Sequence, residues 1–160
     1  MSYEEESRCI FCDIAVGNAP AHIVHQDDVI LAFLDKRPVF AGHCLVVPRK
    51  HFATLTDIPS YIMEPLFANA KLLSQAIEAS MGAGGTFIAI NNKVSQSVPH
   101  FHIHVIPRKK GDGLKGFFWP RIRYRNEEYM EQVRDRIAQA VSEMRENDRY
   151  TSLVEQDFIK

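Results

Sequence analysis

The chain has 160 residues, 46% hydrophobic and 24% charged, and 19 basic against 20 acidic residues give a net charge of −1. This length fits one domain, and the balanced charge argues against a general nucleic-acid binder, which would carry a basic surplus. The longest apolar run, residues 29–34, is far shorter than the roughly 20 residues that span a bilayer. Residues 1–6 are acidic, unlike a targeting peptide. We therefore expect a cytoplasmic protein with no membrane or nucleic-acid partner.

Short apolar segments separated by turn residues predict five extended pieces. They cover residues 22–25, 29–35, 43–48, 86–91 and 101–107. Residues 60–81 and 126–146 carry apolar side chains at helical spacing, and residues 9–17 read as a short helical turn. Short strands joined by hairpin-like loops, with two segregated main helices, predict an α+β domain on an antiparallel sheet of about five strands. We expect a single domain over residues 1–160.

Three alternating histidines, His100, His102 and His104, are the most informative chemical feature of the sequence. If residues 101–107 form a strand, the three imidazoles share one face and the apolar residues between them line the other. Burying three imidazoles side by side is unfavourable unless they have a task. Two tasks fit, a metal cluster and catalysis with an imidazole as nucleophile. The residues alone leave both open.

Two of the three cysteines, Cys9 and Cys12, form a C-x-x-C pair. In a reducing compartment this spacing indicates metal or redox chemistry, and three cysteines do not make a disulfide framework. The third cysteine, Cys44, lies within an apolar run. We expect it to be a small buried residue of the core.

The order of these motifs resembles the histidine triad nucleotide-binding superfamily, with Hint-like and Fhit-like features. His-Phe-His-Ile-His-Val-Ile at 100–106 matches its His-φ-His-φ-His-φ-φ signature, and Gln-Ser-Val precedes it. The upstream segments, in matching order, are Cys-Ile-Phe-Cys at 9–12, Leu-Ala-Phe-Leu-Asp at 31–35 and Gly-His-Cys-Leu-Val-Val-Pro-Arg-Lys-His at 42–51. The likeness covers residues 9 to about 110, some two thirds of the chain.

The resemblance implies an enzyme that cleaves at the α-phosphate of a purine nucleotide conjugate, usually an adenine one, through a covalent nucleotidyl-histidine. The conjugate would be a diadenosine polyphosphate, a nucleoside phosphoramidate or an aminoacyl-adenylate, and no organic cofactor is implied. The middle histidine would be the nucleophile. The implied catalytic residues are His102, His104, His43 and Ser97. The implied substrate-binding residues are Asp35 for the ribose, Phe33 beside the base, and Asn91 and Gln96 near the phosphates.

Simpler roles and other functions stay open for several of these residues. Ser97 also fits a cap before the strand, and Asp35 fits a turn residue that opens the next loop. The basic run 108–110 either holds a polyphosphate tail or is a solvated loop. The alternative functions are a metal-dependent hydrolase, with the triad as its metal site, and a non-catalytic nucleotide-binding regulatory module.

The resemblance also implies a structural zinc ion and a homodimer. Some relatives with an N-terminal C-x-x-C bind zinc at positions that correspond to Cys9, Cys12, His51 and His100. Such a zinc ion would tie the N-terminal turn to the sheet. The alternative is a helix start without metal, with two buried thiols. The dimer would pair through the helix 60–81 and a sheet edge to form a continuous sheet, and the broad apolar arc of that helix favours this. Trp119 would then lie near the partner's active site.

Overall fold

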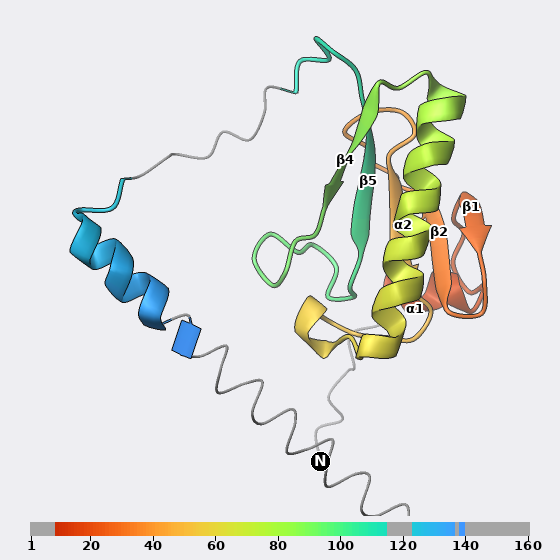
Figure 1. Ribbon diagram of the computed structural model, residues 1–160. Coiled ribbons are helices and arrows are strands. Elements are labelled where there is room, and N and C mark those ends of the chain that lie inside the picture. The colour runs from red at the N-terminus through yellow and green to blue at the C-terminus, as the bar shows by residue number, and fades with distance from the viewer. Residues whose placement is uncertain (1–8, 115–122, 137, 140–160) are drawn as a thin grey trace, which may run out of the picture. The chain divides into compact units, whose positions relative to one another are not determined.

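A five-stranded antiparallel sheet forms the framework of the computed structural model (Figure 1). The strands lie in the order β1-β2-β3-β5-β4, so β1 and β4 are the two edges. The structure describes residues 9–114, 123–136, 138 and 139. The strands are β1 (Ile23–Gln26), β2 (Ile30–Leu34), β3 (Cys44–Pro48), β4 (Gly85–Ala89) and β5 (Ile103–Arg108). The predicted α+β class and antiparallel sheet are confirmed.

Three helical segments accompany the sheet, α1 (Ile10–Ala15), the 3₁₀ turn η1 (Leu55–Asp57) and α2 (Ser60–Met81). The bounds of α2 match the prediction. It ends at Gly82, whose φ of 58° lies in the left-handed region that glycine adopts without strain. No helix among the described residues is long and apolar enough to cross a membrane.

The chain divides after Leu114 into two compact units. The first contains the sheet with α1 and α2. The second contains a helix over the described residues 127–136, 138 and 139, within the predicted range 126–146. The rest of that range, and Trp119, lie outside the described residues. The single domain expected from the sequence stays a prediction.

The two faces of the sheet carry separate apolar clusters because side chains alternate along each strand. One cluster lies between the sheet and α2, which covers this face in Figure 1. It includes Cys44, as predicted, and Phe101, Ile103 and Val105 of the histidine segment. The second cluster lies on the α1 side. It consists of Phe11, Ile14, Leu31, Phe33, Leu45 and Val47. The helix α1 is thereby held against the face to which the side chain of His104 points.

The strand predicted at 101–107 begins later, at Ile103. His102, predicted inside the strand, therefore lies before it, as does His100, and of the three histidines only His104 is in β5. Residues before the strand form a bend in which the His100 N–H donates to the Val98 carbonyl at 2.8 Å. The β3–β5 ladder reaches no further than the pair Val46 and Ile103. Leaving the ladder frees His100 to turn away from the strand.

Candidate active site and metal centre

A pocket of about 280 Å³ opens on the α1 side of the sheet. Its apolar lining comes from α1 and the central strands, and the rings of Phe11 and Phe33 meet edge to face at 5.3 Å. Apolar and aromatic walls with a few convergent polar groups are typical of small-molecule sites. The polar or charged residues that line it are His22, Asp35, Lys36, Arg37, Ser97, His102 and His104.

The ring of His102 is oriented by a backbone carbonyl. Its Nδ1 lies 2.7 Å from the carbonyl oxygen of His100, and the ring is buried. A carbonyl oxygen only accepts, so we assign the proton to Nδ1. In the neutral ring, Nε2 of His102 then carries a free lone pair. This is the nitrogen that a nucleophilic role requires.

A second chain of hydrogen bonds orients His43 and His104. The Val39 N–H donates to Nδ1 of His43 at 3.2 Å, and Nε2 of His43 lies 3.0 Å from Nδ1 of His104. Because Nδ1 of His43 accepts, its Nε2 carries the proton and donates to His104, whose own proton is on Nε2. That Nε2 is buried and has no hydrogen-bond partner among the described residues. The rings of His104 and His102 are 4.8 Å apart, so the unpartnered donor of His104 lies close to the proposed nucleophile.

Burial favours the neutral form of His43 and His104. It lowers the pKa of His104 to about 4, the neighbouring His102 and His43 lower it further, and Asp35 opposes them. Burial also lowers the pKa of His43, against the opposing effect of the Asp35 carboxylate, whose Oδ2 lies 3.7 Å from Nδ1 of His43. A neutral imidazole has one donor and one acceptor nitrogen, so His43 can accept from Val39 and donate to His104. Two imidazolium rings carry only donors and cannot bind each other in this way.

Three further predicted site residues, Asp35, Phe33 and Ser97, line the pocket. Asp35 is half-buried, and its Oδ1 accepts a hydrogen bond from the Arg37 N–H at 2.8 Å. Asp35 therefore acts as a turn residue at the start of the loop after β2, which is one of the two roles that the sequence left open. Its other carboxylate oxygen faces His43, so the turn role does not use the whole carboxylate.

Asn91 and Gln96 do not line the pocket. The side chain of Gln96 holds its own loop, accepting from the Lys93 N–H at 2.9 Å and donating to the Ala53 carbonyl at 2.6 Å. Asn91 is exposed and follows the end of β4. Both residues therefore stand outside the pocket lining, and their role near the phosphates stays a prediction.

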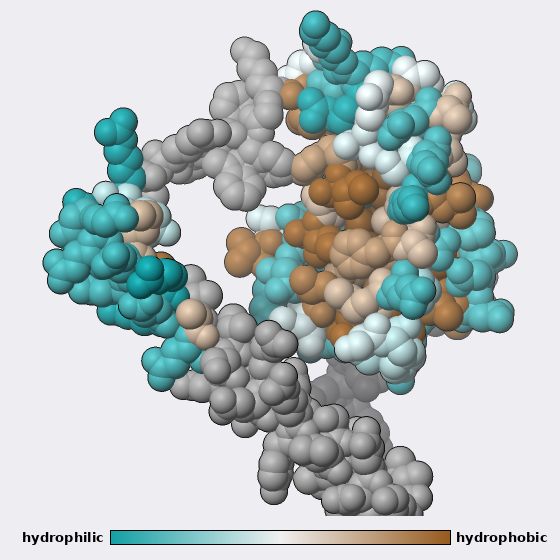
Figure 2. Space-filling model, in the orientation of Figure 1, coloured by the Kyte–Doolittle hydropathy of each residue, from teal (hydrophilic) through white to brown (hydrophobic). Residues whose placement is uncertain are grey.

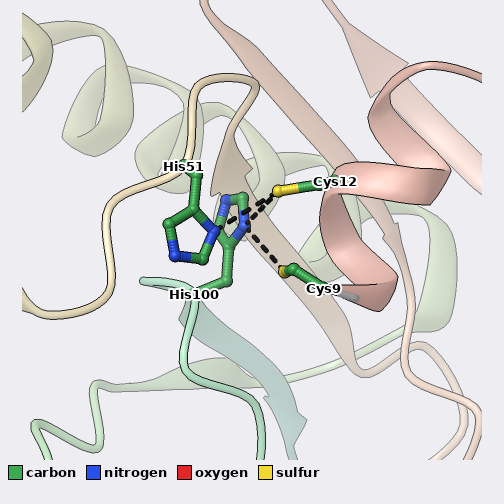
Figure 3. A group of neighbouring side chains, drawn as sticks. All are labelled: Cys9, Cys12, His51 and His100. Carbon is green, nitrogen blue, oxygen red and sulfur yellow. Dashed lines mark hydrogen bonds between the residues drawn. The ribbon is translucent and has the colours of Figure 1, made fainter. Parts of the chain in front are cut away.

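Four side chains from distant segments converge beside the pocket (Figure 3). Cys9 and Cys12 come from the start of α1, His51 from the loop after β3, and His100 from the bend before β5. Nδ1 of His100 lies 3.4 and 3.5 Å from the two sulfurs, and Nδ1 of His51 lies 3.3 Å from that of Cys12. Tetrahedral zinc bonds of 2.0–2.3 Å put ligand atoms about 3.5 Å apart. The four donors therefore fit one metal ion.

Local contacts prepare His100 as a ligand. It is fully buried, and its Nε2 donates to the Pro48 carbonyl at 2.8 Å, which leaves the Nδ1 lone pair facing the thiols. Burial and the nearby Cys9 raise the pKa of Cys12 to about 11. A thiol of such high pKa is a poor redox nucleophile, and a bound cation would favour its thiolate form. Of the two readings of the C-x-x-C pair, the geometry favours metal binding.

A second group of possible donors consists of Asp35, His43 and His104. Here the two rings are joined by their own hydrogen bond, and Nδ1 of His43 accepts from Val39. A metal ion between them would have to break these bonds. The arrangement therefore favours imidazole chemistry over a metal site in the pocket.

Several residues that line the pocket were not among the predicted site residues. Ile10 and Ile14 from α1 line it, as do Lys36 and Arg37 directly after Asp35. Lys36 and Arg37 could have been predicted from the sequence, because they directly follow Asp35, the carboxylate expected to bind ribose. For the α1 residues, only the docking of that helix on the sheet brings them to the site.

A model of the HIT domain matches residues 16–111. The chain belongs to the HIT family. An uncharacterized HIT-like protein of Mycobacterium tuberculosis is 41% identical over 108 residues, 66% of this chain and 75% of that protein. The adenylylsulfatase HINT3 of Arabidopsis thaliana is 34% identical over 111 residues, 68% of this chain and 56% of that protein. A crystal structure of a zinc-bound histidine triad family protein from Mycobacterium smegmatis is similar, with a TM-score of 0.65, 36% identity and coverage of 84% and 96% of the two chains.

The low pKa of the half-buried His104 makes the stability of the fold depend on pH. The pKa of His104 is about 4 in the folded chain against an ordinary 6.5, so on acidification the unfolded chain takes up the proton first. The contribution of neutral His104 to the free energy of unfolding is complete above about pH 6.5 and is lost as the pH falls towards 4. In urea unfolding between pH 7.5 and 4.5, we expect the wild-type free energy of unfolding to fall on acidification. His104→Asn should show a shallower fall, whereas the exposed-loop control Val94→Ala should keep the wild-type slope. Equal slopes for wild type and His104→Asn would contradict this assignment.

Proposed function

We propose that this HIT-family protein is a nucleotide hydrolase or nucleotidyl transferase. It cleaves at the α-phosphate of a purine nucleotide conjugate through a covalent nucleotidyl-histidine on His102. The observation that carries the proposal is the hydrogen bond from Nδ1 of His102 to the His100 carbonyl. It leaves an unprotonated nitrogen in a pocket with apolar walls suited to a base.

The reaction follows from the protonation states of the rings. Nε2 of His102 attacks the α-phosphorus, the bond from phosphorus to the leaving group breaks, and its electron pair departs with that group. The resulting cationic ring is stabilised by donating its Nδ1 proton to the His100 carbonyl. Water, or another acceptor, then attacks phosphorus and loses a proton, the P–N bond breaks, and neutral His102 is restored. Two displacements replace a single harder one.

His104 supplies charge stabilisation in this scheme. Its Nε2–H has no partner among the described residues and lies next to the ring of His102. A phosphate oxygen at this position would accept the hydrogen bond as negative charge develops. The Val39 N–H and His43 keep the proton on that nitrogen. Ser97, which also lines the pocket, adds a hydroxyl donor.

The pocket offers a place for each part of an adenylyl group. We assign the base to the aromatic walls of Phe11 and Phe33 and the ribose hydroxyls to Asp35. The name of the Arabidopsis relative, an adenylylsulfatase, supports a mixed anhydride of adenylate as one substrate class. Diadenosine polyphosphates and nucleoside phosphoramidates are the other two. A panel of all three, analysed for the mononucleotide released, distinguishes them.

Replacing the nucleophile tests this mechanism. We expect His102→Ala to lose roughly 10³-fold or more in turnover, as when other enzymes lose a nucleophile, while still binding nucleotide. When the wild-type protein reacts with a substrate labelled at the α-phosphate and the reaction is quenched, label should remain on the protein. Its bond to the protein should be stable to base and labile to acid, as a phosphoramidate is. His25→Ala is the matched control because His25 does not line the pocket.

Three outcomes would contradict the assignment. Near-normal turnover of His102→Ala without trapped label would remove His102 as the nucleophile. Turnover that needs an added divalent metal would indicate a metal-dependent hydrolase. Measurable nucleotide affinity of the wild-type protein with no turnover of any conjugate would indicate a binding module.

We further propose that the four-residue centre at the start of α1 binds a structural zinc ion. The fit of its donor atoms and the zinc-bound structure of the Mycobacterium smegmatis relative support this. Bound zinc would cross-link α1 to the segments of His51 and His100. It would thereby hold the apolar wall that α1 contributes to the pocket.

Metal analysis tests the zinc centre. Protein purified without chelator should contain about one zinc ion per chain, as expected for a closed four-ligand site. Replacing Cys9 and Cys12 with serine should abolish this zinc and lower the melting temperature more than it lowers turnover. Cys44→Ala is the control, since that cysteine is buried on the α2 side. Absence of zinc from the wild-type protein, or zinc bound by His102, would contradict the proposal.

The α2 face supports a proposed homodimer. Tyr61, Phe67 and Leu72 of α2 are exposed large apolar residues, and Figure 2 shows hydrophobic surface over this side of the molecule. The neighbouring strand β4 is a free sheet edge with an exposed Ile88. Unpaired edge strands favour pairing with another strand. Two copies joined here would continue the sheet and cover the apolar helix face.

The mass in solution tests the dimer. Light scattering at micromolar concentration should give the mass of two chains. Leu72→Glu should shift this towards one chain because it places a carboxylate within the apolar interface. The matched control is Val24→Glu on the opposite edge strand β1, since Val24 is 47% exposed and Leu72 48%. A monomeric wild type, or equal dissociation of the two variants, would contradict this interface.

A further inference from the structure

Two adjacent cations, Lys36 and Arg37, line the rim of the candidate active site. Both residues are exposed, and neither side chain has a hydrogen bond or an ion pair with a described residue. Asp35 is the only carboxylate that lines this pocket in the described chain. The rim therefore carries a surplus of positive charge that the protein itself does not neutralise.

Other arginines near the sheet have structural partners. The guanidinium of Arg49 donates to the carbonyls of Asp27 and Ala15 and to the side chain of Gln26. Arg108 forms a two-point ion pair with Asp112. The basic run 108–110, which the sequence offered as a polyphosphate site, does not line the pocket. Lys36 and Arg37 therefore stand apart, as cations that face a ligand pocket without a partner.

A nucleoside monophosphate leaves these two cations unused. In the proposed function, its phosphate meets His102 and His104, and its ribose meets Asp35. We propose that Lys36 and Arg37 form a second phosphate subsite, so that this protein favours nucleotides with an additional phosphate on a ribose hydroxyl. This inference rests on the proposed function, because it takes the position of the ribose from Asp35.

The backbone places the cations at the ribose end of the pocket. They directly follow Asp35, and the Arg37 N–H is bound to the Asp35 carboxylate at 2.8 Å. Dinucleotide-binding proteins of the Rossmann fold use a carboxylate for a free ribose hydroxyl and an arginine for a phosphorylated one, and the same chemistry can act here. Here both groups are adjacent. Asp35 can take one hydroxyl, while the two cations outweigh its charge and attract a phosphate on the other.

Binding of commercially available nucleotides tests this subsite. Calorimetry should compare AMP, adenosine 3′,5′-bisphosphate, adenosine 2′,5′-bisphosphate and ADP, in which the second phosphate extends from the α-phosphate instead. We expect one ribose bisphosphate to bind about tenfold more tightly than AMP, because hydrogen bonds from two cations to one phosphate are charge-assisted and stronger than neutral ones. The advantage should shrink as salt screens the exposed charges.

A pair of double variants identifies the side chains responsible. In Lys36→Ala/Arg37→Ala, the ratio of bisphosphate to AMP affinity should fall close to one. In the matched control, Lys109→Ala/Lys110→Ala, the ratio should stay at its wild-type value because those lysines do not line the pocket. Equal loss of the ratio in both pairs would mean that general charge, and not this rim, attracts the ligand.

The remaining outcomes separate this inference from the proposed function. If AMP binds but neither ribose bisphosphate binds more tightly, the subsite is wrong and the proposed function stands. If ADP alone gains affinity, the cations serve the leaving-group side and the ribose assignment is wrong. If the wild-type protein binds none of the four nucleotides, the proposed function itself is overturned, and the subsite with it.

Discussion

The hydrogen bonds of His100 connect the two halves of the candidate site. Its carbonyl accepts the Nδ1 proton of His102, while its own ring donates to the Pro48 carbonyl and turns Nδ1 towards the cysteines. One buried residue therefore orients both the proposed nucleophile and the proposed metal centre. The carbonyl oxygen of His100 lies 2.7 Å from Nδ1 of His102. A shift of the backbone at His100 would therefore reorient the His102 ring and its free Nε2.

Burial and hydrogen bonding act together on the other two histidines. Removing His43 and His104 from water lowers the pKa of both, and only neutral rings sustain the relay that starts at the Val39 N–H. The relay ends in a donor without a described partner. A buried donor without a partner costs free energy, and in the proposed function a phosphate oxygen would accept its hydrogen bond.

Much of the architecture could be predicted because its signals are local. The helix α2 shows its apolar stripe along 22 residues, and the strands are bounded by turn residues, so the type of each element and its place along the chain followed from periodicity. The late start of β5 could not be predicted in this way. Residues 100–107 alternate as a strand should, but the contacts of His100 with Pro48 and the cysteines, all distant in sequence, end the ladder at Ile103.

The sequence by itself determined which residue types are available for the proposed chemistry, since the histidine run, the C-x-x-C pair and Asp35 are visible as patterns and resemble those of the family. The tertiary structure decided which of them meet. It brought Asp35, Phe33 and Ser97 to the pocket, turned Gln96 into a support for its own loop, and placed Lys36 and Arg37 at the rim. It also determined which nitrogen of each oriented ring is free. That choice depends on backbone carbonyls and N–H groups that every sequence possesses, and only folding sets them at hydrogen-bonding distance from a particular ring.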